Sequence, residues 1–160
     1  MTAKAGEDDT GRIRIIALGV MRRADGKMLL EKGHDAVKGE TFYRPMGGGV
    51  EFGETGRAAL TREFLEETGC AVEVADFLGT VENIFVYEGM PGHQLVLLYA
   101  CSFRDPAHTQ GTTVPRIDDD GAEACWRSFD EIRAEGARLY PEGIAGLVGA
   151  DPLRAQRDLM

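Results

Sequence analysis

The chain contains few cysteines and no long apolar segment. Its three cysteines, Cys70, Cys101 and Cys125, are far apart and lie in apolar surroundings. An odd, scattered set without a CxxC pair predicts neither a disulfide framework nor a zinc site, and favours reduced core residues in a cytoplasmic protein. Because no apolar run approaches the roughly 18 residues that a membrane-spanning helix needs, we expect no association with a membrane.

Positive charge is also scarce. Lysine and arginine number 18 against 27 aspartates and glutamates, which leaves a formal net charge of -9. A chain of this sign repels long polyanions, so stable binding of long DNA or RNA is not expected. A small anionic substrate is still compatible with the sequence, because a bound divalent cation reverses the charge locally.

The 160 residues, 43% of them hydrophobic, suit one domain with a single sizeable core. We expect a flexible N-terminal tail at 1–11, one domain at 12–150 and a C-terminal tail at 151–160. Periodicity and turn signals predict strands at 12–21, 27–31, 42–44, 49–52, 71–78, 81–88, 93–103 and 123–128. Helical patterns occupy 56–68, 129–136 and 142–148. This order of elements favours a layered α/β or α+β domain.

Three local features of this plan lead to testable expectations. The Asp25-Gly26 turn predicts a hairpin between the first two strands. Residues 33–41 are polar and are expected to form a loop before the glycine cluster. The segment at 93–103 is nearly continuously apolar, which is typical of a buried central strand.

The predicted helix at 56–68 has suitable ends, with Thr55 as its N-cap and Gly69 as its C-terminal stop. Its charged sector has apolar residues on both flanks: Leu60 and Phe64 on one, Ala58 and Leu65 on the other. Two apolar flanks predict a helix packed on more than one side. Its carboxylates would then lie in a crevice.

Three glutamates lie in one narrow sector of this helix. Glu63, Glu66 and Glu67 are three and four residues apart, and three neighbouring like charges destabilise a bare helix. A positive partner is therefore expected, either Arg62, four residues before Glu66, or a divalent cation. Clustered carboxylate oxygens are hard ligands that suit Mg²⁺ or Mn²⁺.

The residues before the helix support the same reading. The run Gly47-Gly48-Gly49 lets the backbone bend and approach a ligand closely. Glu54 lies near the helix start, where the helix dipole favours an anion. An acidic run alone is more often a solvated helix face after a glycine loop, but the complete pattern of residues 48–70 argues against that interpretation.

That complete pattern resembles the Nudix box, G-x5-E-x7-R-E-U-x-E-E-x-G-U, in which U is a bulky apolar residue. The seven fixed residue types all stand at the required spacing: Gly48, Glu54, Arg62, Glu63, Glu66, Glu67 and Gly69. Phe64 and Cys70 take the two U positions, and Cys70 is smaller than the usual residue. Met46 stands where many members have proline. The motif is very specific to the family.

The resemblance implies a Nudix-type α/β/α sandwich with a mixed β-sheet. Members of the family hydrolyse a nucleoside diphosphate linked to another moiety, by attack of water on phosphorus with the help of Mg²⁺ or Mn²⁺. By the family pattern Glu63, Glu66 and Glu67 hold the metal, together with a backbone carbonyl near Gly47. Glu66 and Glu67 are the principal ligands, and Glu63 is either a ligand or the general base. Arg62 would orient a neighbouring carboxylate, and Glu54 would support the centre without binding metal.

Further candidates lie outside the helix. Some relatives use a later acidic residue as the general base, and the candidates here are Glu88, Asp118 to Asp120 and Glu123. Candidate substrate contacts are Tyr43, Arg44, Glu51, Glu88 and His93. Aromatic rings can stack on a nucleobase, but for Phe85 and Trp126 core packing is the preferred interpretation.

Three functions compete at this point. The first is hydrolysis of a small diphosphate substrate of nucleotide, ADP-ribose or nucleotide-sugar type. The second is a non-catalytic nucleotide-sensing module, although such domains commonly lose box carboxylates and none is lost here. The third, isomerisation of a prenyl diphosphate, needs further catalytic residues that the sequence does not identify. Relatives commonly form dimers, and a homodimer is compatible with this sequence.

Overall fold

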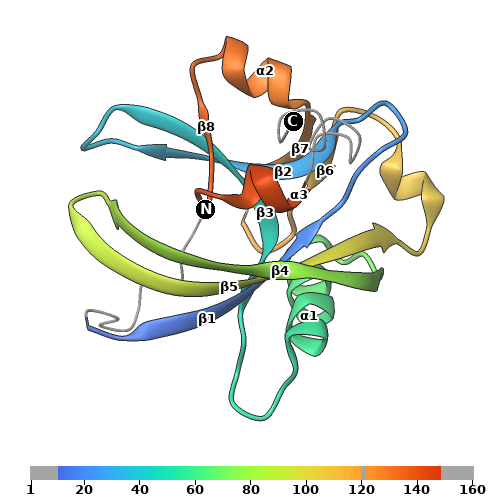
Figure 1. Cartoon of the computed structure of the whole chain (residues 1–160). Coiled ribbons are helices and arrows are strands. Elements are labelled where there is room, and N and C mark those ends of the chain that lie inside the picture. Colours follow the sequence, from blue (N-terminus) through green and yellow to red (C-terminus); the bar gives the residue numbers. More distant parts are fainter. Residues whose placement is uncertain (1–10, 120–121, 149–160) are drawn as a thin grey trace, which may run out of the picture.

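The computed structural model describes residues 11–119 and 122–148. Eight strands form one sheet in the order β4-β5-β1-β3-β2-β7-β6, with β8 paired to β3 (Figure 1). The strands are β1 (Ile13–Val20), β2 (Met28–Asp35), β3 (Glu40–Gly49), β4 (Val72–Tyr87), β5 (Met90–Phe103), β6 (Thr113–Pro115), β7 (Glu123–Arg127) and β8 (Arg138–Leu139). The helices are α1 (Gly56–Thr68), the short 3-10 helix η1 (Pro106–Thr109), α2 (Phe129–Ala134) and α3 (Ile144–Val148). Apart from Gly11, both predicted tails lie outside the described residues.

Helices cover both faces of this sheet (Figure 1). Successive residues of a strand point to opposite faces, so Ala17 of β1 joins the core under α1 with Phe64, while Leu18 joins the second core with Ile132 of α2 and Ile144 of α3. The β1–β5 and β3–β8 pairs are parallel and the other described pairs are antiparallel. The predicted α/β/α sandwich with a mixed sheet is therefore confirmed.

The predicted hairpin between the first two strands is wrong. The turn at Gly26 does form, with its N–H donating to the Arg23 carbonyl. However, β3 lies between β1 and β2, and in the described residues only a single bridge, Arg22–Met28, joins the two segments. Strand β1 is apolar on both faces and takes β5 and β3 as its neighbours, so the hydrophobic pattern decides the pairing more than the turn does.

The glycine cluster belongs to one continuous strand, so the separate short strands predicted around it are wrong. The loop predicted at 33–41 is confirmed only as a short turn at 36–39, because β2 extends to Asp35 and β3 begins at Glu40. The first part of β3, Glu40–Pro45, pairs with β2, and the second part, Met46–Gly49, pairs with β1. At Gly47, where φ is 148°, an added Cβ would lie 2.0 Å from the Ala17 carbonyl oxygen. Only glycine fits this crossing between two partner strands.

Helix α1 begins and ends as predicted. The Thr55 hydroxyl accepts a hydrogen bond from the Ala58 N–H at 3.1 Å, and Gly69 ends the helix in the left-handed conformation. The prediction of two packed flanks is wrong, because Leu65 is 45% exposed and Ala58 is exposed as well. The helix rests on the sheet through one flank only, so its carboxylate sector lies at the boundary between the sheet and solvent.

The cysteines behave as core residues. All three are free, and Cys70 and Cys101 are buried. Burial raises the pKa of the Cys101 thiol to about 12, so that it stays protonated and unreactive. Among the described residues, no helix is long and apolar enough to cross a membrane.

Candidate active site

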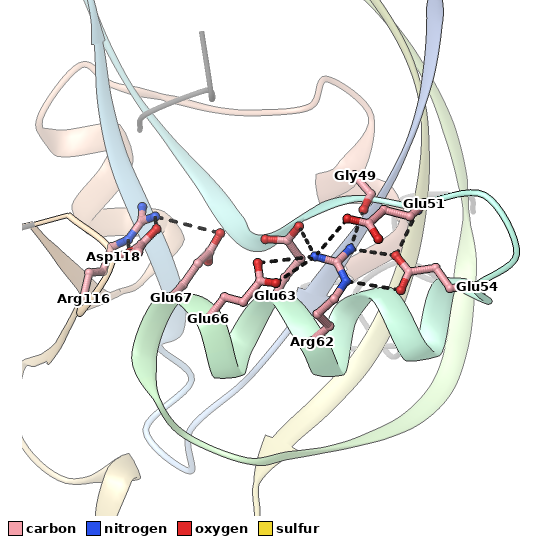
Figure 2. A network of polar contacts seen from close by, with 9 residues as sticks. All are labelled: Gly49, Glu51, Glu54, Arg62, Glu63, Glu66, Glu67, Arg116 and Asp118. Atoms are coloured by element: carbon pink, nitrogen blue, oxygen red, sulfur yellow. Dashed lines mark hydrogen bonds and ion pairs between the residues drawn. The ribbon is translucent and has the colours of Figure 1, made fainter. Parts of the chain in front are cut away.

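Arg62 is the centre of the polar network along α1 (Figure 2). Its Nε and Nη2 atoms donate to the two carboxylate oxygens of Glu54 at 3.2 and 2.6 Å, and Nη2 also donates to the Gly49 carbonyl at 2.9 Å. On the helix itself, Nη1 donates to Glu63 at 3.0 Å and lies 3.3 Å from Glu66. One guanidinium therefore joins the end of β3, the loop before the helix and two of the three helix carboxylates.

The loop before the helix is fixed by Glu54. Its carboxylate also accepts a hydrogen bond from the Glu51 N–H at 2.9 Å. The hydrogen bonds from Arg62, and then that from the Glu51 N–H, hold the pKa of Glu54 below its ordinary range. The Glu51 side chain is 72% exposed and approaches Arg62 only to 3.9 Å. Glu54 is thus occupied in holding the loop to the helix.

Glu63 lies against the glycine run. A Cβ added at Gly48 would lie 2.4 Å from the Glu63 carboxylate carbon. The absence of a side chain at 48 is therefore what allows this carboxylate to lie beside β3. A side chain at this position would displace the Glu63 carboxylate from β3.

Glu67 is the least satisfied carboxylate of the helix. It is buried, its Oε1 atom lies 3.8 Å from Arg116, and its Oε2 atom is buried without a hydrogen-bond partner. Burial first, and then the neighbouring charge of Glu31, raises the pKa of Glu67 to about 9. The buried Oε2 atom of Glu67 therefore lacks a partner that would stabilise its negative charge.

Behind Glu67 is an ion cluster that sequence reasoning missed. Arg116 donates to the buried Glu31 carboxylate at 2.6 Å and forks onto Asp118 at 3.1 and 2.8 Å. Arg44 lies 3.4 Å from the other oxygen of Glu31. The sequence gives one signal of this cluster: a charged residue, Glu31, directly follows the apolar run of β2. Its inward orientation depends on the strand register, which the sequence alone does not determine.

The helix carboxylates lie at one end of a cleft of about 520 Å³. The predicted site residues that line it are Arg44, Gly47, Glu63, Glu66, Glu67, His93 and Asp118. Tyr43 is fully buried and its hydroxyl donates to Glu135 at 2.6 Å, so the structure places it in the core. Trp126 is buried as expected, whereas Phe85 lines the cleft, against the expectation of core packing.

Of the described acidic residues outside α1 that were considered as a general base, the structure brings one into the cleft. Asp118 lines it, while Glu123 is exposed on β7 and Glu88 lies in the turn between β4 and β5. Glu88 has a positive φ of 48°, and its N–H donates to the Asp35 carboxylate at 3.0 Å. Asp120 lies outside the described residues.

The carboxylates fit a divalent cation by their chemistry. In residues 11–119 and 122–148, no three acidic, histidine or cysteine side chains converge as a ready-made metal site; Arg62 and Arg116 occupy several of the oxygens instead. The buried Oε2 of Glu67, which has no partner, identifies where positive charge is missing. Glu63 and Glu66 contribute further hard oxygen donors to the same cleft.

Comparison with known proteins agrees with this geometry. The NUDIX domain family model matches residues 12–145. A MutT-like protein from Streptomyces ambofaciens is 29% identical over 135 residues, which cover 84% of this chain and 77% of that protein. A MutT NUDIX hydrolase from Burkholderia pseudomallei is 26% identical with a TM-score of 0.52, over 75% of this chain and 86% of that one.

The E. coli ORF135 protein has the same fold, with a TM-score of 0.61 at 23% identity over 95% of this chain and 98% of that one. Because the family model covers most of the sequence, the chain belongs to the Nudix family. The predicted assignment to this family and to its hydrolases is confirmed.

Proposed function

We propose that the chain is a Mg²⁺- or Mn²⁺-dependent hydrolase that cleaves a nucleoside diphosphate linked to another moiety, by attack of water on phosphorus. The substrate class includes nucleotides, ADP-ribose and nucleotide sugars. The observation that supports this proposal is the buried, unpartnered Oε2 atom of Glu67 beside two further helix carboxylates in one cleft. A buried carboxylate oxygen without a hydrogen-bond partner is costly, so a site built this way suits a cation.

Glu66 and Glu67 would be the principal ligands of that cation, with Glu63 and a backbone carbonyl near Gly47 as further candidates. The cation, when bound, supplies Lewis-acid neutralisation of diphosphate charge. The chain's own residues orient the carboxylates and bind the phosphate groups. Arg62 fixes Glu63 relative to the glycine run, and Arg44 supplies positive charge in the cleft for a phosphate group.

A proton must leave the attacking water, and Asp118 is the acidic side chain outside the box best placed to accept it. It lines the cleft on the side where Arg116 approaches Glu67. The fork from Arg116 orients its carboxylate. Glu63, which also lines the cleft, is the alternative general base within the box.

The experiment measures hydrolysis of nucleoside triphosphates, ADP-ribose, nucleotide sugars and dinucleoside polyphosphates, by chromatographic separation of the nucleotide products, with Mg²⁺ or with EDTA. Wild type is compared with Glu67→Gln, and Glu82→Gln is the matched control because Glu82 is exposed on β4 away from the cleft. We expect turnover of at least one compound that needs Mg²⁺, persists in the control and is lost in Glu67→Gln. Undiminished turnover in Glu67→Gln, or turnover in EDTA, would contradict the proposal.

The sensing module stays the competing function. Tight binding of ADP-ribose without Mg²⁺-dependent turnover of any compound in the panel would favour it. The intact set of box carboxylates favours the enzyme. A cytoplasmic location and a homodimer stay predictions; the free cysteines are compatible with the former.

A further inference from the structure

The ring of Phe85 stands at the end of the cleft formed by the β4–β5 hairpin, and a glycine makes room for it. Phe85 on β4 pairs across the strands with Gly92 on β5. A Cβ at Gly92 would lie 2.3 Å from the Phe85 Cζ atom and within 2.8 Å of both Cε atoms. The outer part of the ring therefore occupies the space of the missing side chain, and the hairpin backbone supports it from below.

The ring is left without an aromatic partner inside the protein. The other hairpin repeats the same arrangement, since Phe42 lies over Gly33. There, however, the ring is buried and has edge-to-face contacts with Tyr87 and Tyr140. Phe85 is half-buried, lines the cleft, and contacts no other aromatic ring of the described chain. A supported, unpaired ring that faces a cleft is suited to stack on a planar group.

Two amide side chains lie beside this ring. Asn83 and Gln94 pair across the same two strands and stand two residues from Phe85 and Gly92, hence on the same face of the sheet. Neither amide forms a side-chain hydrogen bond within the described chain. Gln94 lines the main cleft, and both amides line a cavity of about 70 Å³ next to it, which Phe85 also lines. Amides offer donors and acceptors together, as the edge of a nucleobase does.

Positive charge lies between this end of the cleft and the carboxylates of α1. Arg14 is the register partner of Gln94 on β1, and its guanidinium lies 3.1 Å from where a Cβ of Gly49 would be. Arg44 lines the cleft from β3, where it is paired with β2. The succession of ring and amides, then arginines, then carboxylates corresponds to the base, the phosphates and the cation of a bound nucleotide.

We propose that Phe85, Asn83 and Gln94 form a nucleobase subsite, in which the base stacks on Phe85 and its edge is bound by the two amides. The proposal rests on the proposed function and narrows it, because the substrate is then recognised by its base as well as by its diphosphate. A diphosphate whose other groups are only a sugar or a lipid alcohol would leave this end of the cleft empty.

The test is equilibrium binding, measured by calorimetry so that it does not depend on turnover. The probes are the α,β-methylene analogues of ADP, GDP, UDP and CDP, which resist hydrolysis between the phosphates, and inorganic diphosphate, which has no base. Wild type is compared with Phe85→Leu and Gly92→Ala. The matched control is Phe77→Leu, because Phe77 is on the same strand and exposed but outside the cleft.

We expect wild type to bind at least one analogue more tightly than inorganic diphosphate. Phe85→Leu should weaken that analogue roughly tenfold or more, leave diphosphate binding unchanged, and differ from Phe77→Leu, which should match wild type. Gly92→Ala keeps the ring but displaces it, so it should weaken the same analogue; its unfolding midpoint verifies that it is folded.

Three results would overturn the base subsite. One is an analogue affinity in Phe85→Leu equal to that of wild type. The second is an equal loss of analogue and diphosphate binding, which would mean that Phe85 only supports the fold. The third is a wild-type protein that binds no analogue more tightly than diphosphate. A protein that binds the analogues through Phe85 but hydrolyses nothing would refute the proposed hydrolase and leave the base subsite standing.

Discussion

Replacing Glu67 with glutamine should change the pH dependence of stability in the metal-free protein. The pKa of Glu67 is raised from 4.5 to about 9, with burial as the largest cause. At pH 7 the folded protein therefore holds a proton on this carboxylate that the unfolded chain has lost. The stability that this proton contributes is complete below about pH 4.5 and is lost as the pH rises toward 9.

The size of the effect follows from proton linkage. One proton gives a slope of about 1.4 kcal/mol per pH unit, so wild type should lose about 3 kcal/mol of unfolding free energy between pH 6 and 8 relative to Glu67→Gln. The assay is urea unfolding of both proteins in EDTA at three pH values. The control is Glu66→Gln, whose side chain is half exposed, and which should change stability by less than about 1 kcal/mol.

Magnesium should offset most of this loss in wild type. At pH 8 and a concentration about 100 times its dissociation constant, a cation that binds only the folded state adds about 2.7 kcal/mol. Wild type should gain this stabilisation and Glu67→Gln should not. The reasoning is refuted if the difference between the two metal-free proteins stays constant within about 0.5 kcal/mol from pH 6 to 8, because Glu67 would then be ionised in the fold without any cation.

Three further substitutions test other parts of the site. Arg116→Met leaves the buried Glu31 without its 2.6 Å partner and should cost about 3–5 kcal/mol in urea unfolding; a cost under about 1 kcal/mol would mean that water reaches Glu31. Gly48→Ala places a Cβ 2.4 Å from the Glu63 carboxylate carbon, so Mn²⁺ affinity should fall while helix content by circular dichroism stays unchanged. Thr55→Ala removes the N-cap of α1 and should cost about 1 kcal/mol of unfolding free energy with an unchanged KM; a raised KM would show that the helix start contacts substrate.

The parts of the structure that the sequence predicts well are those determined by neighbouring residues. Helix α1 and both of its ends follow from local capping and from the spacing of its charges. Its three glutamates line the same cleft for the same reason. The strand pairing is harder to predict from the sequence. A turn at Gly26 indicates that the chain reverses, but it does not indicate whether the two flanking strands become neighbours in the sheet. In the structure β3 lies between them.

The missed site residues come from segments that are far apart in the chain. Glu31 and Arg116 are separated by 85 positions and meet only because β2 and the segment after β6 flank the same cleft. Phe85 lies in the run Ile84-Phe85-Val86, which is apolar at every position, so no alternation indicated which side chain faces inward. The register with β5 places Phe85 over Gly92 and leaves its neighbours on the exposed face.

The most direct test of the metal centre is to measure bound Mn²⁺ by electron paramagnetic resonance while titrating the metal-free protein, and to follow turnover in the same samples. Wild type and Glu82→Gln should bind Mn²⁺ and gain activity in parallel, whereas Glu67→Gln should lose both. If Glu67→Gln bound Mn²⁺ as tightly as wild type and hydrolysed the substrate as fast, the buried carboxylate of α1 would not be a metal ligand, and the proposed mechanism would be contradicted.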